Sequence, residues 1–282
     1  MKNILIPSDF SHNALNAAHC ALKMYHEVTC SFYILNAYYP NTSITSGFGS
    51  TVKWKGTKKS EREISEEMLL EMLDSLKQNN PNPKHTFHAI SKSGSVLPAI
   101  KEVISNQGID LIVMGTKGAT GAKRVFMGSN TVKVIDNEGN CPIIAVPRTY
   151  DFIGLNSLIF PTDFSRAFTV GELNALVELA TLWKSEIRIF HLSKQFSYND
   201  EEKANREMLK DFFKGLELSF YKGIIDAEVP HAIAKFSQER KADLIALVHY
   251  PRSFLDKLTK EAIVKKVSFQ TNVPLMVLPS NL

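Results

Sequence analysis

A glycine-rich stretch follows a short apolar run in the middle of the chain. Gly115, Gly118 and Gly128 lie in the stretch GTKGATGAKRVFMGSN, which ends with Ser129 and Asn130. Glycine tolerates positive φ values and lets a ligand approach the backbone amides closely. The residues after Gly128 begin a segment of helical periodicity, and the first turn of a helix has free N–H groups and a positive dipole end. Together these features predict a seat for a phosphate group.

A carboxylate near the amino terminus is a second candidate ligand-binding group. Asp9 follows the apolar run NILIP, and its carboxylate can accept hydrogen bonds from a ribose or a base. In open α/β sheets, ligands bind at the carboxyl ends of the strands, close to the point where the strand order reverses. Asp9 and Gly115 each follow a predicted strand, so we expect them at the same crevice. One end of this crevice suits phosphate and the other suits a sugar, which together predict a nucleotide.

The elements that must position these residues alternate regularly. Short apolar runs are separated by segments in which apolar residues recur with helical periodicity. Nearly continuous apolar strands alternating with helices predict a parallel sheet covered on both faces. The crossovers between such strands are expected to be right-handed. The apolar runs of the first half are residues 3–7, 31–37, 85–91, 110–115 and 142–146.

The chain also repeats itself. NILIPSDFS at 3–11 recurs as SLIFPTDFS at 157–165, and CPIIAVP at 141–147 recurs as VPLMVLP at 273–279. Self-similarity of this length indicates two copies of one domain joined head to tail. The predicted fold class is therefore α/β, with two tandem open five-stranded parallel sheets flanked by helices. The expected domains are residues 1–149 and residues 150–282.

On these motifs the chain resembles the universal stress proteins, in a tandem two-domain form. The spacing Gly115-x2-Gly118-x9-Gly128-Ser129 is that of the ATP-binding signature in the nucleotide-binding branch of the family. PSDFS after the first strand matches the family's opening motif. The resemblance implies an adenine nucleotide alpha hydrolase-like fold with strand order 3-2-1-4-5 in each domain. It also implies self-association through the fifth strands, here as a homodimer of tandem chains.

The resemblance further implies ATP in the first domain, with magnesium carried by the nucleotide, and a regulatory role in the stress response. Carried over by position, Asp9 serves the ribose and adenine side, and the backbone of Ala37 serves the adenine ring. The glycine loop and the start of the helix after it serve the phosphates. The candidate nucleotide-binding residues are Pro7, Asp9, Ala37, Gly115, Thr116, Gly118, Gly128, Ser129 and Asn130.

The second copy departs from this pattern. At the positions equivalent to the glycine loop it has Val248, Pro251, Glu261 and Ala262. Proline has no amide hydrogen to donate, and a glutamate would place negative charge where phosphate should lie. We therefore expect no triphosphate in the second domain and assign it a role in pairing. Asp163 is nevertheless present in this copy, so a purely structural role for the aspartate after the first strand remains an alternative.

A loop over residues 39–60 belongs to the first copy alone and leaves two interpretations open. It is rich in Gly, Ser, Thr and Lys, and with the preceding residue it presents Tyr38, Phe48 and Trp54. The second strand ends beside the expected pocket, so these aromatic residues could form a lid on the base. The more general interpretation is a surface insertion.

Composition and charge exclude several classes of protein. A hydrophobic content of 44% with 22% charged residues is typical of a globular chain, and no apolar run approaches the length of a membrane helix. The net charge is +4, with basic residues dispersed among acids rather than interleaved with stacking aromatics, which disfavours nucleic acid. The amino terminus lacks the features of a signal peptide, so we expect a cytoplasmic protein. Cys20, Cys30 and Cys141 show no metal-ligand spacing, and no metal site is predicted.

No residue beside the glycine loop is an obvious nucleophile or general base, and the motif G-x-x-x-x-G-K-[ST] is absent. These observations favour a nucleotide-binding protein over an enzyme, and no catalytic residue is assigned. One alternative is an interaction scaffold that binds no nucleotide. Another is a nucleotidyl-transferring or slowly ATP-hydrolysing enzyme on the same fold. A dehydrogenase is disfavoured because the glycines follow the fourth strand and G-x-G-x-x-G is missing.

Overall fold

The chain divides into two compact units, Met1–Phe152 and Ile153–Leu282. The computed structural model describes residues 1–40, 59–116, 128–193, 197–224, 228–249, 267 and 271–280. Several residues named in the sequence-based expectations lie outside these ranges. They are Phe48, Trp54, Gly118, Pro251, Glu261 and Ala262.

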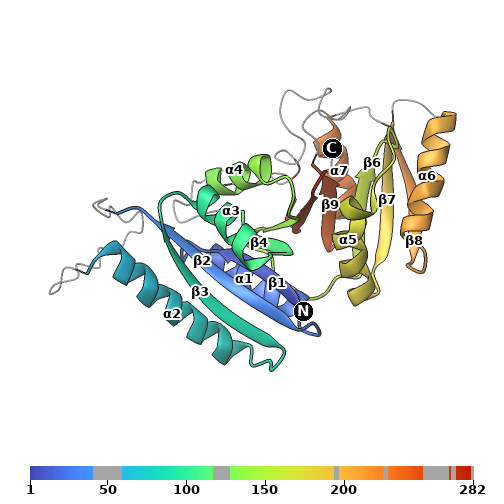
Figure 1. Ribbon diagram of the computed structural model, residues 1–282. Coiled ribbons are helices and arrows are strands. Elements are labelled where there is room, and N and C mark those ends of the chain that lie inside the picture. The colour runs from blue at the N-terminus through green and yellow to red at the C-terminus, as the bar shows by residue number, and fades with distance from the viewer. Residues whose placement is uncertain are drawn as a thin grey trace. The chain divides into compact units, whose positions relative to one another are not determined.

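The first unit has a five-stranded parallel sheet in the order β3-β2-β1-β4-β5 (Figure 1). This order confirms the prediction made for the first domain. β1 is central: its Ile4 lies between Phe32 of β2 and Leu111 of β4. The strand order reverses at β1, so the carboxyl ends of β1 and β4 flank the crevice where ligands of such sheets bind. The strands are β1 (Lys2–Pro7), β2 (Cys30–Tyr38), β3 (His85–Ser93), β4 (Leu111–Gly115) and β5 (Ile143–Val146).

Helices cover both faces of this sheet. α1 and α2 pack on one face, and α3 and α4 pack on the other (Figure 1). Two of the helix starts have a local cause in the sequence. The Ser11 hydroxyl accepts a hydrogen bond from the Ala14 amide at the start of α1, and Ser60 forms a reciprocal capping box with Glu63 at the start of α2. The helices are α1 (His12–Met24), α2 (Glu61–Asn79), α3 (Val96–Gln107) and α4 (Ser129–Asn137).

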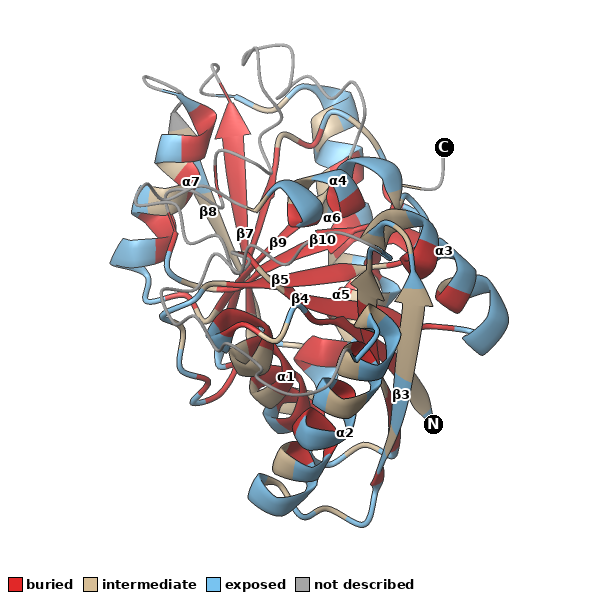
Figure 2. Ribbon diagram, turned by 90° about the vertical axis from the view of Figure 1, so that its left-hand side faces the viewer, coloured by how far each residue is buried: buried red, intermediate tan, exposed pale blue. Residues whose placement is uncertain are grey.

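Burial follows the position of each strand in the sheet. Ile4, Leu5 and Ile6 of β1 are fully buried, as are Leu111 and Ile112 of β4. β3 differs, since most of its residues are intermediate or exposed (Figure 2). It is the outermost strand of the first unit and has a strand neighbour on one side only. The buried central strands of the sheet therefore support the crevice residues, whereas β3 is an outer strand with many solvent-exposed residues.

The second unit repeats this architecture, with the strand order β8-β7-β6-β9-β10. α5 and α6 contact each other, and Asn205 of α6 donates a hydrogen bond to the Phe164 carbonyl oxygen (2.8 Å). α7 packs on the other face, where Phe236 stacks on Phe190 of β7 at 4.0 Å between ring centroids. The elements are β6 (Ser157–Thr162), α5 (Val170–Trp183), β7 (Glu186–Ser193), α6 (Asp200–Phe212), β8 (Leu218–Ile224), α7 (Val229–Glu239), β9 (Leu244–Val248) and β10 (Leu275–Leu278).

Candidate functional site

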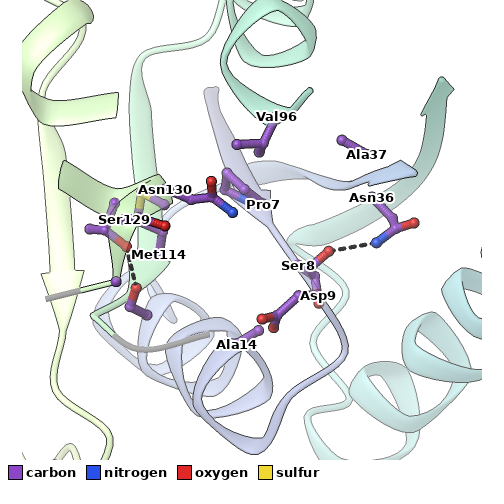
Figure 3. Close-up of a pocket in the computed structure, with 13 residues that line it drawn as sticks. Pro7, Ser8, Asp9, Ala14, Asn36, Ala37, Val96, Met114, Ser129 and Asn130 are labelled. Atoms are coloured by element: carbon purple, nitrogen blue, oxygen red, sulfur yellow. Dashed lines mark hydrogen bonds between the residues drawn. The ribbon is translucent and has the colours of Figure 1, made fainter. Parts of the chain in front are cut away.

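A pocket of about 270 Å³ opens in the first unit at the carboxyl ends of β1, β2 and β4. In Figure 3, Ser129 and Asn130 lie on one side of the opening, and Ser8 and Asp9 lie on the other. The volume is close to the lower end of the range for small-molecule pockets, about 300 Å³. The structure brings seven of the predicted residues to its wall: Pro7, Asp9, Ala37, Gly115, Gly128, Ser129 and Asn130. Thr116 does not line it, and Gly118 lies outside the described residues.

The turn after β1 is held by short-range hydrogen bonds. One carboxylate oxygen of Asp9 accepts from the Ser11 amide (3.1 Å), and the Ser8 hydroxyl accepts from the Phe10 amide (3.0 Å). Phe10 has a φ of 61°, in the left-handed region that residues other than glycine seldom adopt. The turn places Asp9 at the pocket and Ser11 at the start of α1. Asp9 therefore has a local structural role and also faces the pocket.

The opposite side of the pocket is the amino-terminal end of α4. Gly128 precedes the first helical residue and makes no side-chain capping bond. Its amide donates to the Thr116 carbonyl oxygen, and the Thr131 hydroxyl donates to the Gly115 carbonyl oxygen (2.9 Å). These bonds tie the start of α4 to the end of β4. The amides of the first turn, which cannot pair within the helix, therefore lie beside the pocket and can donate to an anion.

Gly115 and Gly128 do not use the positive φ that glycine tolerates. Gly128 has a φ of −56°, and Gly115 is not among the glycines with positive φ. A different constraint requires glycine at 115. A Cβ atom there would lie 2.7 Å from the Asn13 side chain of α1, closer than real Cβ atoms approach other atoms. Close packing, rather than φ, accounts for this residue.

A buried polar network that the sequence analysis missed fixes the floor of the pocket. The side-chain amide of Asn36 on β2 donates to the Ser8 carbonyl oxygen (2.8 Å), and the Ser65 hydroxyl of α2 donates to the Asn36 side-chain oxygen (2.8 Å). Ser65 also exchanges a hydrogen bond with Ser91 of β3 (2.7 Å). The network links α2 and β3 to the residue next to Asp9. Other lining residues not foreseen are Ser8, Ala14, Asn36, Val96, Met114 and Thr131.

The described wall of the pocket carries few ionisable groups. Among its described lining residues, Asp9 is the one ionisable side chain, and no lysine or arginine contributes. An anion would therefore be held by backbone amides and the dipole of α4 rather than by described cationic side chains. A sugar or base could instead use the Asp9 carboxylate and the backbone of β2.

The described residues give no indication of a metal site or of a reactive thiol. No three His, Cys, Asp or Glu side chains gather there in a way that could hold a metal ion. All three cysteines are buried and free. Burial raises the pKa of the Cys20 and Cys141 thiols to about 12 and that of Cys30 to about 11, so they are protonated and weakly nucleophilic.

The corresponding turn of the second unit keeps the first part of this arrangement. One carboxylate oxygen of Asp163 accepts from the Ser165 amide (3.0 Å), and Phe164 has a φ of 55°. The same turn therefore forms beside Val248, which takes the place of Gly115 at the end of β9. This hydrogen bond does not require a glycine loop, so by itself it is no evidence of a ligand at Asp9.

After this turn the two units diverge. The residue that caps α1 follows Asp9 by two positions, whereas Thr169, which caps α5, follows Asp163 by six. The extra residues include Phe168, which is buried against Phe160, and Arg166, which pairs with Glu172 at 2.8 Å. Packing and an ion pair thus fix this segment in the second unit.

Comparison with known proteins agrees with the α/β architecture of open parallel sheets. The chain belongs to the Universal stress protein family, which matches residues 1–147. Universal stress protein MJ0531 of Methanocaldococcus jannaschii is 30% identical over 147 residues, covering 52% of this chain and 82% of that protein.

Two solved structures match nearly the full length of both chains. A universal stress protein from Archaeoglobus fulgidus superposes with a TM-score of 0.67 at 15% identity, covering 98% of each chain. Protein PA1789 from Pseudomonas aeruginosa, described as functionally unknown, has a TM-score of 0.64 at 14% identity and covers 100% of this chain and 93% of its own. At these identities the matches establish the fold. For the described residues, no helix is both long enough and apolar enough to cross a membrane.

Proposed function

We propose that the first unit binds an adenine nucleotide, ATP with its magnesium, and that the chain is a regulatory nucleotide-binding protein of the stress response. The observation that carries this proposal is the position of Asp9 and the amino-terminal end of α4 on opposite sides of one pocket (Figure 3). A carboxylate suits the hydroxyl groups of ribose, and free amides at a helix start suit phosphate. Family membership supports the same assignment.

In this proposal each wall of the pocket has a separate task. Asp9 accepts hydrogen bonds from the ribose, and the backbone at Ala37 of β2 borders the adenine ring. The amides of Ser129 and Asn130 hold the phosphates, and Gly128, whose amide donates to the Thr116 carbonyl oxygen, borders them. Nucleotide-dependent ordering of this region would change the surface offered to a partner, which is regulation by population shift.

Binding without turnover is the better supported form of the activity. Asp9 is the one ionisable side chain among the described lining residues, and one of its oxygens is engaged by the Ser11 amide. No described lining residue is placed as the general base that would activate water or another nucleophile. The pocket is therefore suited to retain ATP, and we assign no catalytic residue.

The second unit serves for pairing in this proposal. β5 and β10 each end the strand order of their own unit, and the family resemblance assigns pairing to these fifth strands. In this proposal, tandem chains also self-associate through them. Light scattering on the full chain tests this: twice the mass of one chain at micromolar concentration is expected, and a single-chain mass would contradict it.

The nucleotide assignment is tested by calorimetry on matched variants. Asp9→Asn retains an oxygen that can accept from the Ser11 amide but removes the charge, and Asp163→Asn makes the same change in the second unit. We expect one ATP per chain, about tenfold weaker binding for Asp9→Asn, and no change for Asp163→Asn. Two ATP per chain, or equal losses in both variants, would overturn the assignment. Chromatography of the incubated nucleotide should show ATP without ADP.

A further inference from the structure

A second, smaller pocket of about 170 Å³ lies in the first unit beside the start of α2. Ala37 of β2 lines the nucleotide pocket, and its neighbour Tyr38 lines this one. Successive residues of a strand point to opposite faces of the sheet, so the side chains of Ala37 and Tyr38 leave β2 in opposite directions, and Asn36 borders both pockets. Three aromatic side chains and one carboxylate border the second pocket: Phe10, Tyr38, Tyr39 and Glu61, with Asn36, Ile64 and Ser65 completing it.

The carboxylate of this pocket differs from two others on α2. Glu66 is paired with Arg62 (2.8 Å) and Glu67 with Lys59 (2.6 Å). Glu61 makes no ion pair with any residue in the described part of the chain. It is the first residue of α2. The pocket therefore presents a negative charge that no described cation neutralises.

Aromatic side chains combined with a carboxylate form a characteristic environment for ammonium groups. The face of an aromatic ring is electrostatically negative and attracts a cation, and quaternary ammonium ligands are commonly held this way. The volume lies below the range of about 300–1,000 Å³ that accommodates drug-sized ligands. A group the size of a trimethylammonium head therefore fits better than a nucleotide. Tyr39 is 56% exposed, which leaves this side of the pocket accessible from solvent.

We propose that this pocket is a second ligand site, for a small organic cation of the alkylammonium class. Phe10, Tyr38 and Tyr39 would contact the alkylammonium group, and Glu61 would supply the opposing charge. The site is chemically distinct from the nucleotide pocket, where anion-binding amides lie beside a single carboxylate.

The two pockets share Asn36, which provides a physical route between them. Its side-chain amide donates to the Ser8 carbonyl oxygen (2.8 Å), and the Ser8 hydroxyl accepts from the Phe10 backbone amide (3.0 Å). A ligand against Phe10 and Asn36 therefore acts on the residue that precedes Asp9. We infer that cation and nucleotide binding are coupled. This coupling rests on the proposed nucleotide function, whereas the cation site itself does not.

Calorimetry with choline and 3,3-dimethyl-1-butanol tests the cation site. The two probes have nearly the same shape, but only choline carries a charge. We expect choline to bind at one site per chain in the millimolar range and the neutral probe to bind at least about tenfold more weakly. Equal affinity for both probes, or no heat with choline, overturns the proposal.

Variants locate the binding. Tyr38→Leu and Glu61→Gln are expected to weaken choline binding at least about fivefold. Tyr33→Leu is the matched control on β2, where Tyr33 stacks on His88 outside the pocket. Glu66→Gln is the matched control on α2. Far-ultraviolet circular dichroism verifies that each variant is folded, and equal losses in the controls would assign the heat to another location.

Coupling is tested by titrating ATP with and without saturating choline. The dissociation constant of ATP should change at least about twofold, and that of choline should change by the same factor when ATP is present, because linkage is reciprocal. If ATP fails to bind at all, the proposed nucleotide function is lost, whereas the choline titrations still decide the cation site. If ATP binds with unchanged affinity, the coupling through Asn36 is overturned.

Discussion

The side chain of Asn13 occupies the space that a Cβ atom at Gly115 would need. The distance from that Cβ position to the Asn13 side-chain oxygen would be 2.7 Å. Asn13 is buried on α1 and donates to the Val146 carbonyl oxygen of β5 (3.2 Å). One side chain thus packs α1 on the end of β4 and tethers it to β5. Gly115 makes this packing feasible directly at the wall of the nucleotide pocket.

Gly115→Ala should therefore destabilise the first unit by overpacking, with a cost of about 1–3 kcal/mol. Asn13→Ala in the same chain should recover part of this loss, because it removes the colliding side chain. In the Asn13→Ala background, the Val146 carbonyl oxygen still accepts a hydrogen bond from the Thr116 amide (2.9 Å). It therefore keeps a hydrogen-bond partner. Urea unfolding of the two single variants and the double variant measures the coupling. Strictly additive losses would show that the contact does not determine the residue at 115.

Ser129→Asp separates the stability of α4 from its proposed role in phosphate binding. Ser129 is the first residue of α4, where a negative charge stabilises a helix by about 0.3–1 kcal/mol. The same charge would repel a phosphate at these amides. We expect an unchanged or higher melting temperature together with at least about tenfold weaker ATP binding.

The control for this variant is Asn137→Asp at the other end of α4. It adds the same charge away from the pocket, so the affinity for ATP should not change, while the helix should lose stability. Unaltered ATP affinity in Ser129→Asp would contradict the placement of phosphate at the start of α4.

Local patterns predicted much of this fold. The alternation of apolar runs and helical periods was sufficient to predict a parallel sheet covered by helices, because buried parallel strands and their crossover helices have distinct periods. The strand order of the first unit was implied by the family resemblance. The PSDFS and PTDFS repeat likewise located Asp9 and Asp163. Contacts between distant residues left no such pattern. Asn36 and Ser65 are 29 positions apart, and only a polar residue within the apolar run ILNA hinted at the first of them.

Two other features depended on packing that sequence periodicity does not encode. Phe10 beside the pocket is left-handed, with a φ of 61°, whereas the described glycines Gly115 and Gly128 are not. The longer segment after Ser165 was not anticipated, because the repeated motif ends at that residue. Its path depends on the burial of Phe168 and on the pairing of Arg166 with Glu172, which become visible only in three dimensions.

His191 should make the second unit less stable as the pH falls. The ring lies at the end of β7, 1% exposed, stacked on Phe164 at 4.7 Å and 4.8 Å from Tyr198. Burial lowers the pKa of His191 below its usual value. The unfolded chain therefore takes up a proton near pH 6.5 that the folded chain resists, and stability is lost as the pH drops from about 7 to about 5.

The variant His191→Phe should reduce this pH dependence of the melting temperature. It should not abolish it, because burial also lowers the pKa of His19 and His85 in the first unit. His88→Phe is the matched control, since His88 is exposed on β3. A slope unaffected by His191→Phe would show that the ring is protonated in the folded state without cost.

Arg166 should be essential to the stability of the second unit because its partner has no access to water. Glu172 is 0% exposed, and its carboxylate accepts from the Arg166 guanidinium (2.8 Å) and from the Thr169 amide (2.8 Å). Arg166→Ala removes the cation that pairs with that buried charge, and losses of about 3–5 kcal/mol are typical of such changes. Arg62→Ala, which breaks an exposed pair with Glu66, should cost about 0.3–0.5 kcal/mol.

Urea unfolding measures the loss of stability in the Arg166→Ala and Arg62→Ala variants. Adding Glu172→Gln to Arg166→Ala should restore part of the loss because a neutral amide is less costly to bury. A loss in Arg166→Ala no larger than that in Arg62→Ala would mean that water reaches Glu172 once the arginine is gone.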